Sequence, residues 1–412
     1  MTAIWGRVRL SAEKDLGMKK ADVIVVGAGP SGLRTAARLA GAGLDVRVLE
    51  KKTRVGAGVV CTGIVGKEVF DDFGLDRGPV IEELRRVRLV SPFETALVYE
   101  HPRPFACVVD RERFDGALAA SAAAAGATIA CDERVEDVAV GPDGVEVTVR
   151  DGDGTVSRER AAMAVLATGV DFGLQKRLGL SSPRDFLKGA QVECAFPGAD
   201  VTTLFFGREV APGAFAWSVP SGGGRARVGL LTQKDPKACL RRLLERSFGG
   251  VPAAAVESAI RTKPVAQGLL ARTYGDRVLA VGEAAGQTKT TTGGGISYGL
   301  ACADLAADVI RECFGRSSFG PADLAEYERR WKALLQKEIL VGQYTRRMCA
   351  RLSDGRIESL FQLARTDGIV PIIRDKADFD WHSGLIFALL QRLSFMRVFR
   401  EVKDRLGPMS MS

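Results

Sequence analysis

The stretch from residue 21 to residue 50 constrains the fold of this chain more than any other part of it. Residues 21–26 form an apolar run broken only by Asp22, as expected of a strand buried on both faces. The run ends in the turn G-A-G-P-S-G at 27–32, and we expect a helix at 33–42 and a second strand at 45–49. An acid, Glu50, follows that strand. A strand, glycine turn, helix, strand and acid in this order are the fingerprint of a dinucleotide-binding fold.

Each part of this first motif has a physical role. The first glycine permits the tight turn, the second lets the backbone approach a pyrophosphate, and the third packs the helix against the strand. The amides and dipole of the helix N-terminus then hold the phosphates, and the acid accepts the ribose hydroxyls. The expected cofactor contacts of the first motif are Gly27, Gly29, Ser31, Gly32, Glu50 and Lys51.

A second motif distinguishes FAD from NAD. Residues 278–286 read V-L-A-V-G-E-A-A-G, and residues 288–295 read T-K-T-T-T-G-G-G. A strand here delivers Glu283 to the ribityl and pyrophosphate region, and Gly293, Gly294 and Gly295 aim helix amides at the N1–C2=O edge of the flavin. A reduced flavin is an anion at that edge, so a positive helix end stabilises it.

Short alternating runs between these motifs predict antiparallel strands inserted into the nucleotide-binding unit. We therefore expect an α/β fold, with a discontinuous FAD-binding Rossmann-like domain of the GR2 type, an inserted antiparallel β-sheet substrate domain and a helical C-terminal region. The expected divisions are a flexible extension at 1–17, FAD-binding segments at 18–79, 111–180 and 270–315, substrate (catalytic) segments at 80–110 and 181–269, and a helical C-terminal region at 316–412.

Composition excludes several classes of protein. Hydrophobic residues make up 46% and charged residues 26%, which is ordinary for a globular enzyme. The eight cysteines form no CxxC pair and there are only two histidines, so no metal site is expected. No basic block interleaved with aromatic residues indicates nucleic-acid binding. No apolar run reaches the ~18 residues of a membrane-spanning helix.

The remaining expectations concern surroundings and partners. The net charge of +8 suits a flavin dinucleotide, a phosphorylated substrate or an anionic membrane surface, but an Arg-rich proteome would also explain it. We expect a monomer with reduced thiols in the cytoplasm, with peripheral contact at the inner membrane face as an option. The segment 379–402 places apolar residues among spaced arginines, which fits either a core-packing terminal helix or a helix lying on a membrane surface.

Several segments give the chain a resemblance to a known family. Residues 108–118 read V-V-D-R-E-R-F-D-G-A-L and 282–286 read G-E-A-A-G. Over about residues 20–310 the chain resembles the geranylgeranyl reductases, within the p-hydroxybenzoate-hydroxylase-like flavoprotein superfamily. This resemblance implies that Arg111 contacts the flavin dinucleotide and that Val135 offers a backbone contact to the adenine. Gly169 follows Ala-Thr where NADPH-using hydroxylases carry Asp-Gly, which argues against hydroxylase-type NADPH docking.

Two further segments resemble the reductase branch. V-V-C-T-G-I-V-G at 59–66 is similar to that family's cysteine loop beside the isoalloxazine, and F-A-W-S-V-P at 215–220 is similar to its motif Y-x-W-x-F-P. The resemblance implies catalytic roles for Cys61, Phe215 and Trp217. A free cysteine is more often a small buried hydrophobe, so Cys61 is either a packing residue or a proton donor. Trp217 is either a core aromatic or a wall of the substrate pocket.

These observations predict an FAD-dependent reductase that saturates isolated C=C bonds of a polyprenyl chain by hydride transfer and protonation. The alternatives are an FAD-dependent monooxygenase of an aromatic or lipid substrate and a non-catalytic prenyl-lipid carrier. A prenyl diphosphate, a prenylated lipid and an isoprenoid quinone all fit as substrate. The electron donor, NAD(P)H or a reduced ferredoxin-type protein, stays open because the chain carries no second nucleotide-binding fingerprint.

Overall fold

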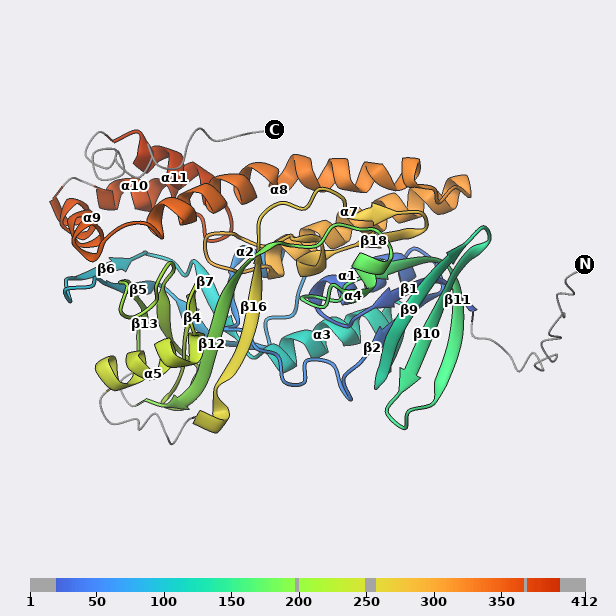
Figure 1. The fold of residues 1–412 in the computed structure, drawn as a ribbon, viewed down its shortest axis with the longest axis horizontal. Coiled ribbons are helices and arrows are strands. Elements are labelled where there is room, and N and C mark those ends of the chain that lie inside the picture. Colours follow the sequence, from blue (N-terminus) through green and yellow to red (C-terminus); the bar gives the residue numbers. More distant parts are fainter. Residues whose placement is uncertain (1–19, 197–199, 249–256, 367–368, 393–412) are drawn as a thin grey trace, which may run out of the picture.

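The computed structural model describes residues 20–196, 200–248, 257–366 and 369–392. The extension expected at 1–17 and the end of the C-terminal region beyond 392 lie outside the described residues. The molecule is elongated, with one large β-sheet at each end of its long axis (Figure 1). The α/β fold class expected from the sequence is confirmed.

The nucleotide-binding end is built on an eight-stranded sheet. Its central strands are parallel because helices connect them, and their two-sided burial explains the continuous apolar runs. Its strands are β17 (Tyr274–Gly275), β18 (Val278–Ala280), β11 (Val156–Leu166), β1 (Lys20–Val26), β2 (Val46–Glu50) and β8 (Thr128–Cys131). In addition, β10 (Gly144–Asp151) pairs antiparallel with β11, and β9 (Glu133–Gly141) pairs antiparallel with β10.

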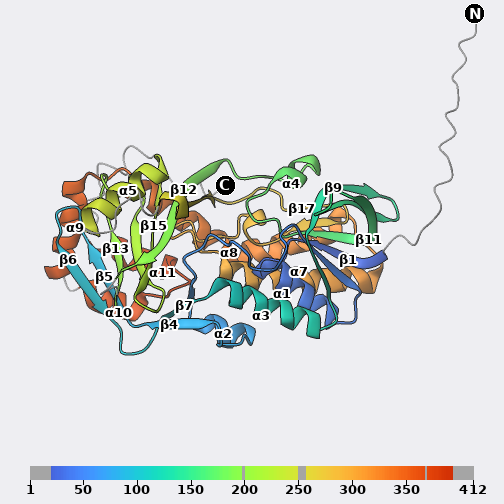
Figure 2. The same ribbon diagram turned by 90° about the horizontal axis from the view of Figure 1, so that it is seen from below.

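Helices cover one face of this sheet, and the β9–β10 hairpin covers the other. Figure 2 shows α1 (Pro30–Ala40), α3 (Arg111–Ala124) and α7 (Ile296–Arg316) side by side beneath the strands. The helix expected at 33–42 begins instead at Pro30, because a proline without an N–H group fits the first helical turn. The large side chains Phe114, Tyr327 and Trp331 are fully buried in the core between these helices and α8 (Pro321–Cys349).

The other end is built on a seven-stranded sheet, antiparallel except where β13 pairs with β5. Its order is β16 (Arg261–Gln267), β12 (Asp185–Ala195), β15 (Arg225–Thr232), β14 (Ala216–Pro220), β13 (Thr202–Phe205), β5 (Arg86–Val90) and β6 (Ala96–Glu100). The helix α5 (Pro236–Ser247) packs on its outer face. A small third sheet consists of β3 (Ile64–Gly66), β7 (Ala106–Val109) and β4 (Val80–Leu84).

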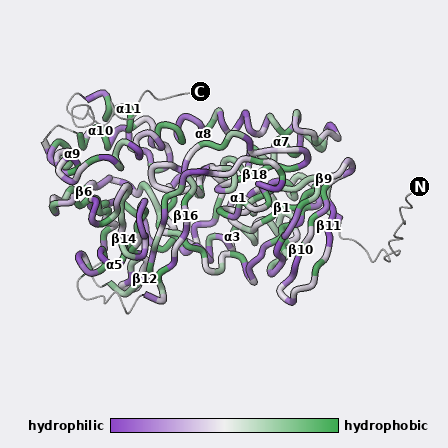
Figure 3. Tube along the Cα trace, viewed as in Figure 1, coloured by the Kyte–Doolittle hydropathy of each residue, from purple (hydrophilic) through white to green (hydrophobic). Residues whose placement is uncertain are grey.

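Short elements complete the chain: α2 (Glu68–Phe73), α4 (Gly173–Arg177), and the 3-10 turns η1 (Glu257–Ala259) and η2 (Gly282–Ala285). The long helix α8 spans both ends of the molecule and leads to α9 (Asp354–Thr366), α10 (Ile369–Lys376) and α11 (Ser383–Leu390) (Figure 1). Hydrophilic and hydrophobic residues alternate along α8 (Figure 3). None of the helices in the described ranges is long and apolar enough to cross a membrane.

Candidate active site

The first glycine turn has the geometry that its sequence predicts. Gly27 has φ of 106°, and a Cβ there would lie 2.5 Å from the carbonyl oxygen of Ala167. A Cβ on Gly32 would collide with the backbone of Gly27. A Cβ on Gly29, the N-cap of α1, would meet nothing within 4 Å. The first and third glycines are therefore required by the fold, whereas the second leaves open space in front of the helix N-terminus, where phosphates bind.

Glu50 lies at the end of β2 and is 9% exposed. Its carboxylate accepts hydrogen bonds from the backbone N–H of Ala28 at 2.8 Å and from that of Lys52 at 3.0 Å. These bonds fix the carboxylate beside the turn and leave further lone pairs for ribose hydroxyls. The neighbouring Lys51 is more exposed and pairs with Asp171 at 3.4 Å.

The two glycine motifs meet in space. Ser31, in the first turn of α1, lies against Gly282 of the second motif and against Gly299 of α7, so closely that a Cβ on either glycine would collide with its hydroxyl. Gly282 also donates its N–H to the buried side chain of Gln287 at 2.7 Å. Gln287 in turn donates to the hydroxyl of Tyr327 at 2.8 Å, which anchors the second motif to α8. Segments about 250 residues apart thus form one surface.

Glu283 is held by a lysine from the other sheet. Its carboxylate accepts from Nζ of Lys263 on β16 at 2.7 Å, and the two side chains are 18% and 34% exposed. Gly169 lies close by, since a Cβ there would be 4.0 Å from the Glu283 carboxylate. Lys263 was not expected from the sequence. The sequence shows Lys263 only as a single lysine within a strand pattern, and such a lysine normally faces solvent.

The triple glycine lies directly before α7, which begins at Ile296 with Gly295 as its N-cap. Gly293 has φ of 79°, a conformation that favours glycine. The segment closes on itself, because Lys289 donates its N–H to Gly294 at 2.7 Å and accepts from Gly293 at 2.8 Å. Gly293 also faces Leu231 and Val265 of the seven-stranded sheet.

Cys61 lies in a loop before β3 and is half-buried. Its sulfur accepts from the N–H of Gly63 at 3.3 Å and lies within hydrogen-bonding reach of the guanidinium of Arg111. Arg111 is anchored by two hydrogen bonds of 3.0 Å to the carboxylate of Asp115. Burial acts to lower the pKa of Arg111, but Cys61 and Asp115 together outweigh it and raise that pKa. Arg111 is therefore a permanent positive charge beside the sulfur.

The cysteine loop is clamped to the seven-stranded sheet. Gln191 of β12 donates to the carbonyl of Cys61 at 3.2 Å and accepts from the hydroxyl of Thr62 at 3.0 Å. Arg227 of β15 donates to the carbonyls of Thr62 at 2.7 Å and Val109 at 3.0 Å. Neither residue was expected from the sequence. Both lie on the face that meets the loop because of the strand register, which is known only once the sheet has formed.

Trp217 lies on the same face of the sheet. Gly229 is the cross-strand neighbour of both Trp217 and Gln191, so one glycine separates the tryptophan from the residue that holds the cysteine loop. The ring of Trp217 covers this glycine, since a Cβ there would be 2.6 Å from the ring. Its Nε1 is buried without a hydrogen-bond partner among the described residues. Phe215 lies beside it, with ring centroids 5.9 Å apart. Cys61, Phe215 and Trp217 are thus brought to one side of the sheet.

Val135 lies apart from these residues, in β9 on the far edge of the nucleotide sheet, where it pairs with Val149. A strand irregularity between Thr148 and Val149 interrupts the pairing at this point. The proposed backbone contact from Val135 to the adenine would come from this edge. In the part of the chain that the structure describes, no three His, Cys, Asp or Glu side chains gather as metal ligands.

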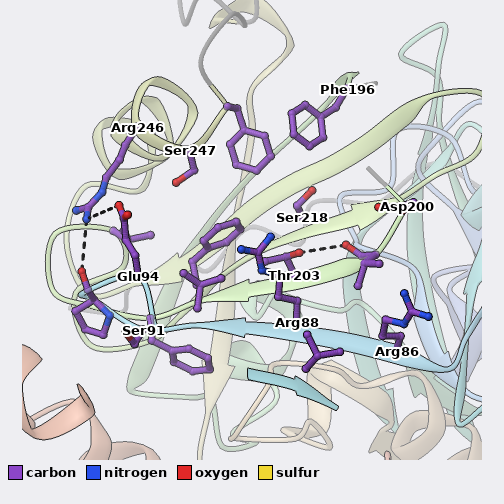
Figure 4. Close-up of a pocket in the computed structure, with 18 of the residues that line it drawn as sticks. Arg86, Arg88, Ser91, Glu94, Phe196, Asp200, Thr203, Ser218, Arg246 and Ser247 are labelled. Carbon is purple, nitrogen blue, oxygen red and sulfur yellow. Dashed lines mark hydrogen bonds and ion pairs between the residues drawn. The ribbon is translucent and has the colours of Figure 1, made fainter. Parts of the chain in front are cut away.

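A cavity of about 760 Å³ opens on the opposite face of the seven-stranded sheet (Figure 4). Ser218 lines it, and because Ser218 follows Trp217 in the strand the two side chains point to opposite faces. Its floor is aromatic, but its rim carries as many acids as arginines, for example Arg246 paired with Glu94 at 3.6 Å. The cavity therefore does not belong to the surface that carries Cys61.

The residues present fit FAD. Open space at Gly29, an anchored acid at the end of β2 and a second acid-bearing motif on the same surface are what a flavin dinucleotide requires. Fold and site together define an FAD-dependent oxidoreductase.

Comparisons with known proteins agree with this class. Residues 20–202 match the FAD binding domain family. Digeranylgeranylglycerophospholipid reductase 2 of Methanothermobacter thermautotrophicus is 30% identical over 357 residues, which are 83% of this chain and 91% of the relative. The digeranylgeranylglycerophospholipid reductase of Methanothrix thermoacetophila is 30% identical over 365 residues, 85% of this chain and 93% of the relative. The chain belongs to the digeranylgeranylglycerophospholipid reductase family, which confirms the resemblance noted in the sequence.

Solved structures support the fold. A geranylgeranyl bacteriochlorophyll reductase-like protein of Thermoplasma acidophilum aligns with a TM-score of 0.80 and 23% identity, covering 94% of this chain and all of that one. A p-nitrophenol 4-monooxygenase of Pseudomonas putida aligns with a TM-score of 0.68 and 19% identity, covering 87% and 97%. A reductase-like protein and a monooxygenase share this fold, so the fold does not decide between the two chemistries.

Proposed function

We propose that this chain saturates isolated C=C bonds in the prenyl chains of a digeranylgeranyl glycerophospholipid, with FAD as its redox cofactor. Support comes from family membership and from the names of its relatives. The observation that carries the chemistry is the position of Cys61, which is beside the Arg111 guanidinium and clamped through Gln191 to the face that bears Trp217.

An isolated alkene is unpolarised, so hydride addition at one carbon must be matched by a proton at the other. Reduced FAD supplies the hydride when bound. The first and second motifs hold the dinucleotide through Gly29, Ser31, Glu50 and Glu283. Phe215 and Trp217 give the sheet an apolar aromatic surface against which a prenyl chain packs and excludes water.

Cys61 is the proposed proton donor. Its thiol gives a proton to the second alkene carbon, and the neighbouring Arg111 guanidinium stabilises the negative charge left on sulfur. Asp115 keeps that guanidinium oriented through its three hydrogen bonds. Because Gln191 and Arg227 fix the loop backbone, the sulfur is held in place without help from substrate.

The decisive experiment is mass spectrometry of the prenyl substrate after anaerobic incubation with chemically reduced enzyme. Gain of two hydrogen atoms for each reduced bond supports the proposal. Oxygen incorporation on aeration would favour the monooxygenase, and an unchanged substrate would favour a carrier. Running a prenyl diphosphate and an isoprenoid quinone in parallel separates the three substrate classes.

Cys61→Ala tests the proton donor. We expect it to bind FAD and to be reduced normally, while reoxidation by substrate slows by about a hundred- to ten-thousand-fold, the usual contribution of a general acid. Cys61→Ser retains a weaker acid of similar size as the matched control. A Cys61→Ala enzyme with a lowered melting temperature and normal reoxidation would show that Cys61 only packs.

We also propose peripheral contact with a membrane surface through the C-terminal helices. This region carries three large exposed apolar side chains, with Val370 42%, Trp381 37% and Phe387 40% exposed. The cation of Lys337 lies 5.3 Å from the ring centre of Phe387, an arrangement suited to anionic headgroups above an acyl boundary. Trp381→Ser with Phe387→Ser should reduce sedimentation with anionic vesicles. Val156→Ser, an exposed apolar residue at the other end of the molecule, is the control.

The monomeric state stays a prediction, which light scattering on a sizing column would test.

A further inference from the structure

A buried charge cluster joins the C-terminal segment to the triple-glycine turn. Asp380 lies between α10 and α11 and is 7% exposed. Its carboxylate accepts from Nζ of Lys289 at 2.5 Å and from the hydroxyl of Ser297 at 2.7 Å. Its backbone carbonyl accepts from the hydroxyl of Tyr298 at 3.0 Å. Gly66, at the end of the strand that follows the cysteine loop, lies against the same carboxylate.

Lys289 is equally enclosed, with 5% of its side chain exposed. Its Nζ also donates to the carbonyl of Phe379 at 3.1 Å and lies 4.6 Å from the centre of the Phe379 ring. The stem of Lys289 lies beneath the glycine turn, since a Cβ on Gly294 would be 3.2 Å from its Cε. One charged pair therefore fixes both the turn and the first residues of α7.

Neighbouring groups hold the segment around the pair in place. Nδ1 of His382 lies 2.5 Å from the hydroxyl of Thr291, and Nε2 lies 3.0 Å from the carbonyl of Phe379. Burial lowers the pKa of His382, and in the neutral ring Nε2 donates to Phe379 while Nδ1 accepts from Thr291. Glu338 of α8 accepts from the N–H groups of His382 and Ser383, both at 2.9 Å. Asp378 is exposed and accepts from the N–H of Asp380 at 2.8 Å.

A buried ion pair contributes little net stability, because the loss of hydration of both charges offsets their attraction. Here the pair matters for two other reasons: it fixes the position of the glycine turn, and its charges contribute to the electric field at the site. The pair supports the helix N-terminus that would face the N1–C2=O edge of a bound flavin, and water does not screen the pair. Each charge alone would act strongly on a flavin that becomes anionic when reduced, whereas together they nearly cancel.

We propose that Lys289 and Asp380 form a positioning pair that holds the Gly293–Gly295 turn and sets the reduction potential of the flavin. This inference rests on FAD binding at the α7 N-terminus, but not on the prenyl substrate. It assigns to the C-terminal segment 378–383 a role in the redox chemistry of a site otherwise built from the first three hundred residues.

The test is a double-mutant cycle on the FAD-loaded protein, read as the midpoint potential in an anaerobic dye-coupled titration. Asp380→Asn leaves Lys289 unbalanced, which stabilises the anionic reduced flavin, so the potential should rise. Lys289→Met leaves Asp380 unbalanced, so the potential should fall. The double variant should return close to the wild-type value. Asp375→Asn with Lys376→Met removes an exposed ion pair, 3.0 Å apart at the end of α10, and is the matched control that should show no shift.

Amide hydrogen exchange of residues 288–297 in FAD-free protein gives a second readout. Both single variants should exchange faster there than the wild type, and the control pair should not. Shifts of the same sign in the two single variants, or no shift in either, would overturn the proposal.

If a single variant loses FAD, the double variant decides: recovered binding supports the pair, and binding as poor as in the single variant rejects it. If the wild-type protein fails to reduce prenyl chains but the two single variants shift the midpoint potential in opposite directions, the proposed substrate is wrong and this inference stands.

Discussion

Gly29→Val tests cofactor binding separately from folding, because the three glycines of the first turn have different roles. Gly27 and Gly32 are required by the fold, whereas Gly29 leaves space for the phosphates. Gly29 has φ of −80°, which any residue adopts, and a Cβ there meets nothing within 4 Å. The folded chain should therefore accept valine with a loss of about 1 kcal/mol or less, mainly from the poorer N-cap. The same side chain would occupy the place where phosphate meets the helix amides.

The expected loss of FAD affinity follows from those amides. Displacing two charge-assisted hydrogen bonds, each worth about 1.5 to 3 kcal/mol, weakens binding by about 3 to 6 kcal/mol. Gly27→Ala is the contrasting variant. At φ of 106° and with its Cβ 2.5 Å from the Ala167 oxygen, alanine should destabilise the fold itself. Backbone strain and overpacking together amount to about 2 to 6 kcal/mol.

Flavin absorbance and a melting curve on FAD-free protein measure the two effects separately. We expect Gly29→Val to be colourless with a near-normal melting temperature, and Gly27→Ala to melt early. A yellow Gly29→Val protein with full flavin occupancy would refute the assignment of the pyrophosphate to this turn.

Three further predictions concern single side chains. Glu50→Ala should weaken FAD by about 1 to 3 kcal/mol in a fluorescence titration, because ribose hydroxyls and the buried N–H of Ala28 lose their acceptor; unchanged affinity would place the ribose contact elsewhere. Lys263→Met should weaken FAD by about 1 kcal/mol, since Glu283 would then repel the phosphates, and the effect should vanish in a Glu283→Gln background. Burial, with the charge of Lys289, lowers the pKa of His382 below 6.5, so the unfolded chain binds more protons and stability falls as pH drops below that value. Melting curves at neutral and acidic pH should show a smaller loss for His382→Asn than for the wild type, and an equal loss would contradict the buried neutral ring.

The sequence by itself determined the two FAD motifs. Gly27, Gly29, Gly32 and Glu50 lie within one βαβ unit, where hydrophobic period and glycine spacing are local signals that survive without knowledge of tertiary contacts. Glu283 and Gly293–Gly295 were recognised for the same reason. The start of the first helix was less accurate, because α1 begins at Pro30 and not at residue 33, and a proline near a helix N-terminus allows more than one boundary.

Only the tertiary structure decided how these motifs are held in place. Gln191 and Arg227 reach the cysteine loop from strands more than 125 residues away, and Lys263 reaches Glu283 from a different sheet. Strand register selects these contacts, and a shift of one residue would turn each side chain to the opposite face.

The pairing of Lys289 with Asp380 was likewise invisible in the sequence, where residues 379–402 suggested only a packed or membrane-bound helix. A lysine and an aspartate far apart in a chain are ordinary surface residues until the fold buries them together. Local patterns therefore determined which cofactor this protein binds, because those patterns act within a few turns of chain. The environment of the flavin depends on long-range contacts, which exist only once the sheets and helices have packed.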